Sequence, residues 1–374
     1  MGIFNTSLQD FFLNLVQDIS KSTTLPKINN PAVDNPPAVE EITEPPVLYE
    51  LAHVDDIARP DIVEQIIEPN SSTASVPPPF ISYATFNRLG ITMKNLSNLL
   101  DSDEDFEMHI IDCNSKDDTW DYLKSLQDKR IKSRTRFKVN LGPIYVLNYN
   151  LTRRKPNQYF FTIDSDVYIK TKNWISKYME IFEAFPEVGL LGVMRDNPYP
   201  RFMPPIIPLV KGDLSYLQLK NAQVGEIMDF IPGCLQGLSP ELINQIGYWC
   251  EENGYGDAEL SPRLTHYTSF KAGFLTTVEI DMKQYIGCNE CLGQSFCNLN
   301  KSVKTCYTLS RKSNMNESFA KKYKWKYLEC FKELAEGKRT AYCASVFDQE
   351  SRKNAVYHED WALENFQHYL RKSN

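Results

Sequence analysis

The stretch YFFTIDSDVYI, Tyr159 to Ile169, has the aromatic and β-branched composition of a buried strand. It contains two carboxylates one residue apart, Asp164 and Asp166, which can converge on one cation where the strand ends. Anionic oxygens with no soft ligand nearby suit Mg²⁺ or Mn²⁺. Aspartates are also common in a solvated turn after a strand. The choice between a metal site and a turn therefore depends on the rest of the chain.

Composition limits the class of protein. The chain has 374 residues, a net charge of -7 and nine cysteines. Its length predicts roughly two domains, or one large domain with appendages. The negative charge argues against a broad basic face for nucleic-acid backbones. No apolar run reaches the roughly 18 residues of a membrane span, and the N-terminus does not resemble a secretory signal. We therefore expect reduced cysteines, a cytoplasmic location and no transmembrane segment.

Residues 1–78 differ in composition from the rest of the chain. Apolar residues at helical spacing predict a short amphipathic helix from Leu8 to Ile19, and we favour docking on the core over binding to a partner or membrane surface. From Leu25 to Pro79 the chain is rich in proline, acidic residues, asparagine and serine. This composition predicts a disordered linker arm, with a short helix near Asp61 to Ile67.

From Phe80 onward, apolar segments of strand and helix type alternate. We predict strands at Phe80–Phe86, Glu107–Asp112, Ile144–Leu147 and Val188–Val193, and helices at Thr92–Leu100, Trp120–Leu126, Trp174–Phe185 and Glu359–Leu370. Such alternation predicts an α/β fold with a parallel sheet. Ligands of these sheets bind at the carboxyl ends of the strands. Asn87, Asp112 and Asp166 all fall there, which favours a site over a turn.

Five motifs occur in succession along this region. They are FNR (86–88), HIIDCNSKDDT (109–119), FTIDSD (161–166), PGCLQGLSPELI (232–243) and GDAELSPRL (256–264). In this order they resemble the family 2 glycosyltransferases of the GT-A fold, over about Phe80 to Phe274. Two features depart from that family: Gly256 stands where it usually has glutamate, and an aromatic and proline-rich insertion runs from Asn197 to Asp229.

The resemblance implies a GT-A catalytic domain at residues 79–280, a Rossmann-like nucleotide-diphospho-sugar transferase with a mixed sheet flanked by helices. Residues 281–374 are expected to form an α-rich extension. The implied activity is that of a metal-dependent, inverting hexosyltransferase. It would move a sugar from a nucleotide-sugar donor, expected to be a UDP-sugar, to a hydroxyl of a glycan, a protein or a modified DNA base.

The same resemblance implies roles for individual residues. Asp257 would be the general base that takes the proton of the acceptor hydroxyl, with a helix N-cap as its structural alternative. Asp164 and Asp166 would hold Mn²⁺ or Mg²⁺. Arg263 would contact a phosphate of the donor, with a salt bridge within the fold as its structural alternative. The residues expected to bind the donor are Thr85, Asn87, Arg88, Asp112, Asn114, Asp117, Asp164, Ser165 and Arg263.

Further ligands are expected outside these motifs. A late histidine completes the metal shell in many GT-A enzymes, and His266 and His358 are the candidates, although a lone histidine is more often structural. Four thiols in a short span, Cys288, Cys291, Cys297 and Cys306, predict a small structural zinc site, with free or paired cysteines as the alternative.

Two other functions remain open from the sequence. A nucleotidyltransferase can be built on a similar sheet, but the chain lacks the usual glycine-rich phosphate loop. A non-catalytic module that binds a nucleotide-sugar or a glycan would tolerate replacement of Asp166 and Asp257.

Overall fold

The computed structural model describes residues 51–68, 77–194, 205–220, 222, 224, 230–282 and 317–373. The predicted helix from Leu8 to Ile19 and the four cysteines from Cys288 to Cys306 lie outside these residues. Within the described part, no helix has both the length and the apolar character needed to cross a membrane.

The elements alternate between strand and helix over most of the chain. The strands are β1 (Ile62–Ile67), β2 (Phe80–Thr85), β3 (Glu107–Asp112), β4 (Ile131–Phe137), β5 (Phe160–Asp164), β6 (Val167–Ile169), β7 (Val188–Val193), β8 (Ile206–Lys211), β9 (Leu214–Leu219), β10 (Leu235–Leu238), β11 (Lys271–Leu275) and β12 (Ile280–Met282). The helices are η1 (Val54–Asp56), α2 (Leu89–Leu100), α3 (Thr119–Ser125), α4 (Pro143–Leu151), α5 (Trp174–Ala184), α6 (Pro240–Ile246), α7 (Asp257–Tyr267), α9 (Glu317–Ala335), α10 (Gln349–Asn354) and α11 (Glu359–Ser373).

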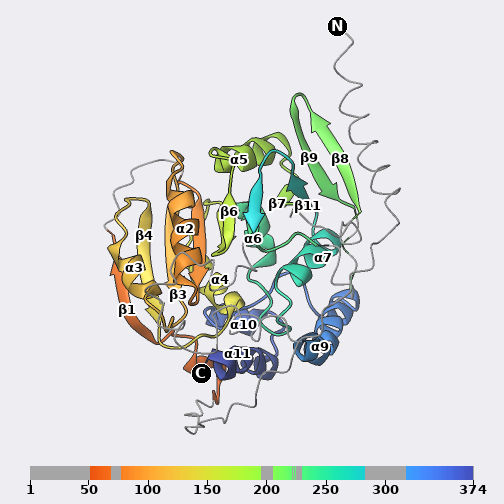
Figure 1. The fold of residues 1–374 in the computed structure, drawn as a ribbon. Helices are drawn as coiled ribbons and strands as arrows, with labels where there is room; N and C mark the ends of the chain where they lie inside the picture. The colour runs from red at the N-terminus through yellow and green to blue at the C-terminus, as the bar shows by residue number, and fades with distance from the viewer. Residues whose placement is uncertain are drawn as a thin grey trace, which may run out of the picture. The chain divides into compact units, whose positions relative to one another are not determined.

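Ten strands form one mixed sheet in the order β1-β4-β3-β2-β5-β10-β7-β11-β9-β8, and β6 pairs with β12 (Figure 1). Strands β4, β3, β2 and β5 are parallel neighbours. Strand β10 lies antiparallel between β5 and β7. The predicted fold class, a mixed α/β sheet flanked by helices, is confirmed.

Helices cover both faces of this sheet, so the central strands are buried on both sides. Side chains of β3 alternate between two cores. Met108 and Ile110 pack with side chains of α2, α3 and α5, whereas Ile111 packs with side chains of α4 and α11. The strand ends are thereby held on a rigid layer, which positions any site built on them.

Two sequence predictions were wrong. The predicted strand at Ile144–Leu147 is part of helix α4, which begins at Pro143 directly after Gly142, whose φ is 91°. Proline at the first helical position suits a helix start. The predicted helix near Asp61–Ile67 is strand β1, which pairs antiparallel with β4 at the edge of the sheet. Its β-branched residues favour a strand, and the pairing satisfies the hydrogen-bonding groups of β4.

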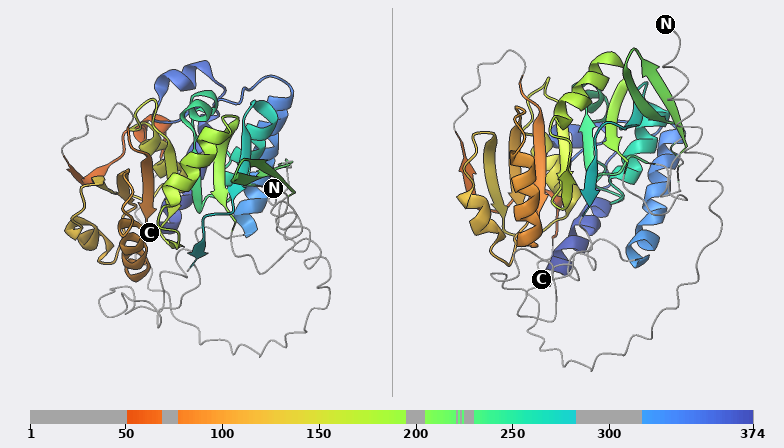
Figure 2. Two further views of the ribbon diagram at one scale, coloured as in Figure 1. Left: turned by 90° about the horizontal axis from the view of Figure 1, so that it is seen from above. Right: turned by 45° about the horizontal axis from the view of Figure 1, so that its top comes forward.

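The predicted α-rich C-terminal extension is confirmed by α9, α10 and α11, which are blue in Figure 2.

A buried carboxylate joins this extension to the sheet region. Glu251 accepts hydrogen bonds from the amide of Asn148 at 2.8 Å, the hydroxyl of Ser345 at 2.6 Å, the backbone of Val346 at 2.9 Å and the hydroxyl of Tyr357 at 2.6 Å. The neighbouring Glu252 receives two hydrogen bonds from Arg339, at 2.8 and 2.7 Å. The division at residues 78 and 280 stays a prediction.

Candidate active site

The ends of three neighbouring strands bring the predicted site residues together. Thr85 of β2 lies opposite Asp112 of β3, and Ala84 lies opposite Asp164 of β5. Because these strands are parallel, their carboxyl ends meet at one edge of the sheet. The loops that leave β2, β3 and β5 therefore start side by side.

Asp112 lies in a buried cluster of polar groups with Ser115 and Arg136, called the Asp112 cluster below. Its carboxylate is fully buried, accepts the backbone N–H of Ser115 at 3.2 Å and also accepts the Ser115 hydroxyl. Arg136 of β4 forms an ion pair with it at 3.3 Å. Burial raises the pKa of Asp112 to about 6, although Ser115 and Arg136 oppose the shift. The Asp112 cluster thus holds a hydrogen-bond acceptor at the carboxyl end of β3.

The loops after β2 and β3 contain every non-glycine residue with positive φ in the described part of the chain: Asn87 at 59°, Arg88 at 66° and Asn114 at 65°. The left-handed region is uncommon for such residues. Hydrogen bonds between the two loops hold this geometry. The backbone of Asn87 donates to the Ser115 hydroxyl at 2.8 Å, and its side chain accepts the backbone N–H of Lys116 at 2.7 Å.

Asp117 and Thr85 support the same loops. The carboxylate of Asp117 accepts the backbone N–H of Leu89 at 3.1 Å and that of Thr119 at 3.1 Å, at the starts of α2 and α3. The Thr85 hydroxyl lies 3.0 Å from that of Thr92. Both contacts fix the starts of helices close to strand ends, so these two residues support the loops beside the Asp112 cluster.

The aspartate pair marks a break in the strand. Strand β5 ends at Asp164, which is exposed, and β6 begins at Val167 and leaves the main sheet. The carboxylate of Asp166, 6% exposed, lies 2.9 Å from the guanidinium of Arg88. One exposed and one buried carboxylate in this turn supply hard oxygen ligands, and this donor set fits Mg²⁺ or Mn²⁺.

Side chains of α2 secure the segment after the break. The amide of Asn95 donates to the carbonyl of Val167, and the side chain of Asn98 accepts the backbone N–H of Ile169 at 2.8 Å. Strand β6 does not pair with the main sheet, and these bonds to α2 help to hold it in place. The turn between Asp164 and Asp166 is therefore held at both ends.

Asp257 lies near the same end of the sheet. It is the first residue of α7, and its carboxylate accepts the backbone N–H of Gly233 at 2.7 Å and that of Ala258 at 2.9 Å. The next residue after Gly233 is Cys234, whose carbonyl accepts the backbone N–H of Asp164 at 3.0 Å. The N-cap position belongs to Gly256. A short backbone path thus connects Asp257 to the aspartate pair.

The other predicted ligands, Arg263, His266 and His358, contact other groups of the protein itself. The buried guanidinium of Arg263 donates to Glu259 at 2.7 Å and to the carbonyls of Ile246, Ala341 and Tyr248. This is the structural arrangement that the sequence left open for Arg263. His266 contacts the carbonyl of Ala222, and Nε2 of His358 lies 2.8 Å from Glu333.

Sequence reasoning missed Arg136 and Ser115 as partners of Asp112. Arg136 also donates to the Ser115 carbonyl at 2.8 Å, so it contacts both other members of the Asp112 cluster. The available signal was the segment IKSRTRF (131–137), which contains β-type alternation and forms β4 next to β3. Arg134 and Arg136 make this segment polar, so its alternation was not recognised as that of a strand.

Comparison with known proteins gives one family match. The model of the family described as glycosyl transferase family 2 matches residues 81–246. No curated protein matches the chain.

Several solved structures are similar to the chain. S. aureus TarS 1-349 is 18% identical, with a TM-score of 0.38, over 53% of this chain and 58% of that chain. The mannosyltransferase PcManGT from Pyrobaculum calidifontis, in complex with GDP-Man and Mn²⁺, is 14% identical, with a TM-score of 0.39, over 81% and 89%. Glucosyl-3-phosphoglycerate synthase from Mycobacterium tuberculosis, in complex with Mn²⁺, uridine-diphosphate and phosphoglyceric acid, is 13% identical, with a TM-score of 0.37, over 59% and 75%. The chain spans less than two thirds of the TarS structure.

Proposed function

Because residues 81–246 match the model of glycosyl transferase family 2, we propose that this chain transfers a sugar from a nucleotide-sugar donor to an acceptor hydroxyl. The observation that carries the proposal is the meeting of Asp112, Asp166 and Asp257 at one end of one sheet. The non-glycine residues with positive φ in the described chain lie in the loops after β2 and β3, at the same end of the sheet. Backbone strain is retained at positions where the surrounding structure and function require it.

We assign the donor side of the site to the Asp112 cluster. Its buried carboxylate accepts a hydrogen bond from the base or ribose of the donor, for which we propose a UDP-sugar. Asn87 and Asp117 keep the flanking loops in place through their contacts with backbone N–H groups. The remaining residues that we assign to donor binding are Thr85, Arg88, Asn114, Asp164 and Ser165.

The diphosphate side of the site is the turn after β5. We assign Asp164 and Asp166 as ligands of Mn²⁺ or Mg²⁺, which when bound compensates the charge of the departing diphosphate. Arg88 holds Asp166 in position and adds positive charge beside it. We leave His266 and His358 out of this site because both rings contact groups elsewhere in the fold.

Asp257 is the proposed general base. Its two backbone hydrogen bonds hold the carboxylate in one orientation. In the transfer step Asp257 takes the proton of the acceptor hydroxyl while that oxygen bonds to the anomeric carbon. The bond from the anomeric carbon to the diphosphate breaks, and the diphosphate leaves with the electron pair. One such displacement inverts the anomeric configuration.

Ligand-induced thermal stabilisation tests the donor site. We would measure the melting temperature with UDP, GDP, CDP and dTDP, each with and without Mn²⁺. A ligand that binds only the folded state raises the melting temperature. We expect a Mn²⁺-dependent rise with one nucleotide, its loss in Asp166→Ala, and its retention in Asp103→Ala, an exposed aspartate at the other end of β3.

Two results would redirect the proposal. If no nucleoside diphosphate raises the melting temperature, the assignment of the metal and donor sites is wrong. If a diphosphate binds but no sugar is transferred or hydrolysed, and Asp257→Asn changes nothing, the chain is a binding module. A preference for nucleoside triphosphates would instead indicate a nucleotidyltransferase.

The proposed function also includes an acceptor and a location. A glycan, a protein or a modified DNA base offers the required hydroxyl. A cytoplasmic location is supported by the absence of disulfides among the cysteines that the structure describes.

A further inference from the structure

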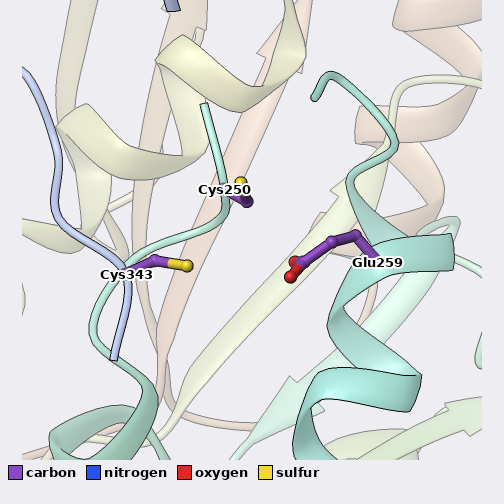
Figure 3. A group of neighbouring side chains, drawn as sticks. All are labelled: Cys250, Glu259 and Cys343. Atoms are coloured by element: carbon purple, nitrogen blue, oxygen red, sulfur yellow. The ribbon is translucent and has the colours of Figure 1, made fainter. Parts of the chain in front are cut away.

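Three side chains with metal-binding atoms meet away from the active site. Cys250, Glu259 and Cys343 each place one potential ligand atom within 4.8 Å of the others, and all three residues are buried. Figure 3 shows the thiol of Cys343 and the carboxylate of Glu259 pointing toward each other, with Cys250 next to them. This group uses none of the cysteines in which the sequence suggested a zinc site.

Backbone pairing holds the three residues in place. Cys250 lies in the loop after α6, Glu259 in the first turn of α7, and Cys343 in the loop after α9. The backbone N–H of Cys343 donates to the carbonyl of Ile246 at 2.9 Å, and its carbonyl accepts from Tyr248 at 3.1 Å. The group therefore forms where the C-terminal extension contacts the sheet region.

One atom of the group lacks the partner that its burial requires. Glu259 is 1% exposed, and its Oε1 accepts from Arg263 at 2.7 Å. Its Oε2 is buried and has no hydrogen-bond partner among the described residues. A buried carboxylate oxygen without a partner destabilises the fold, because it has lost its hydration and gained no hydrogen bond in return. A cation between this carboxylate and the two thiols removes that destabilisation.

We propose that Cys250, Glu259 and Cys343 bind a structural zinc ion, with Cys330 of α9 as the fourth ligand. The thiol of Cys330 lies against Cys250 in the same buried cluster. Ligands of tetrahedral zinc at roughly 2.0–2.3 Å lie about 3.3–3.8 Å from one another. The ligand atoms of Cys250, Glu259 and Cys343 lie within 4.8 Å of one another, so these three need only a small contraction. Soft thiolates with one carboxylate favour zinc over Mg²⁺ or Ca²⁺.

The surroundings suit such a site. A zinc ion with three thiolates and one carboxylate carries net negative charge. The guanidinium groups of Arg263 and Arg339 are both buried and lie near the thiols. Four protein ligands leave no open position, which is the arrangement of structural rather than catalytic zinc. The ion therefore joins α9 and the following loop to the region of α7.

Metal analysis of the full chain tests the site. In a variant with Cys288, Cys291, Cys297 and Cys306 all replaced by serine, we expect about one zinc ion per chain. Adding Cys250→Ala and Cys343→Ala should remove it, whereas adding Cys113→Ala, another buried cysteine, should not. A chelator should lower the melting temperature of the serine variant.

If the alanine variants fail to fold, X-ray absorption of the zinc-loaded serine variant still identifies the ligands of the zinc ion. We expect a first shell of about three sulfurs and one oxygen. A serine variant that retains no metal would overturn the proposal. So would an oxygen- and nitrogen-only shell, or an intact mass two hydrogens lower, which would indicate a Cys250–Cys343 disulfide.

Discussion

The guanidinium of Arg88 lies 2.9 Å from the carboxylate of Asp166, and both side chains are largely buried. Arg88 has φ of 66°, so the loop after β2 adopts an uncommon conformation where it makes this ion pair. The pair joins the end of β2 to the turn after β5. Arg88 therefore compensates the negative charge of Asp166 even without a bound metal ion.

Arg88→Ala should destabilise the protein and increase its response to Mn²⁺. Removing one partner leaves a nearly buried carboxylate without its counter-charge, at a cost of about 1–3 kcal/mol. A bound cation compensates that charge, so Mn²⁺ should raise the melting temperature of the variant more than that of the wild type. Arg59→Ala, at an exposed position, should match the wild type. An equal Mn²⁺ response in all three proteins would exclude Asp166 as a ligand.

Asp112→Asn should flatten the dependence of stability on pH. Burial raises the pKa of Asp112 from 3.8 to about 6, so between these values the folded state binds the proton more tightly than the unfolded state. Stability therefore falls as pH rises through this window, by up to about 3 kcal/mol. Asparagine does not titrate and removes this slope.

Urea unfolding between about pH 4 and 7 measures that difference. The advantage of the wild type over the variant should shrink as pH rises. Asp105→Asn, an exposed aspartate that precedes β3, should keep the wild-type profile. Parallel profiles for wild type and Asp112→Asn would show that Asp112 ionises normally.

Asp257→Asn should abolish transfer while preserving donor binding. Asparagine keeps the size of the side chain and can still accept from Gly233, but it cannot take a proton. General-base catalysis contributes roughly 10²–10⁴-fold, so kcat should fall by about that factor. Asp213→Asn, in the exposed turn between β8 and β9, is the matched control. Unchanged kcat in Asp257→Asn would assign the base elsewhere.

Arg339→Met should loosen the C-terminal extension. Arg339 makes two hydrogen bonds with Glu252, and both residues are buried, so the variant leaves an uncompensated carboxylate. Loss of one partner of a buried pair costs about 3–5 kcal/mol. Lys332→Met breaks an exposed pair with Glu329, which solvent screens, so this variant should lose much less stability than Arg339→Met. Equal losses in urea unfolding would contradict the anchoring role.

Local sequence signals located four of the strands and four of the helices: β2, β3, β5, β7, α2, α3, α5 and α11. They assigned the wrong structure to α4 and β1 and missed β4. Ile144–Leu147 has the apolar residues of a strand, but Pro143 starts a helix there. Strand β4 carries polar residues on a buried edge of the parallel group, where Arg134 and Arg136 find partners from distant segments. Such partners are not visible in a local pattern.

The sequence by itself determined the class of fold and the strand ends at which acidic residues gather. Apolar periodicity sets which segments become strands, and parallel strands align their carboxyl ends, so Asp112 and Asp164 could be placed from the sequence alone. Only the tertiary structure decided which groups face one another across the chain. The contacts of Arg88 with Asp166, of Asp257 with Gly233, and of Cys250 with Cys343 depend on loop conformations and helix packing, which long-range contacts determine and local periodicity does not encode.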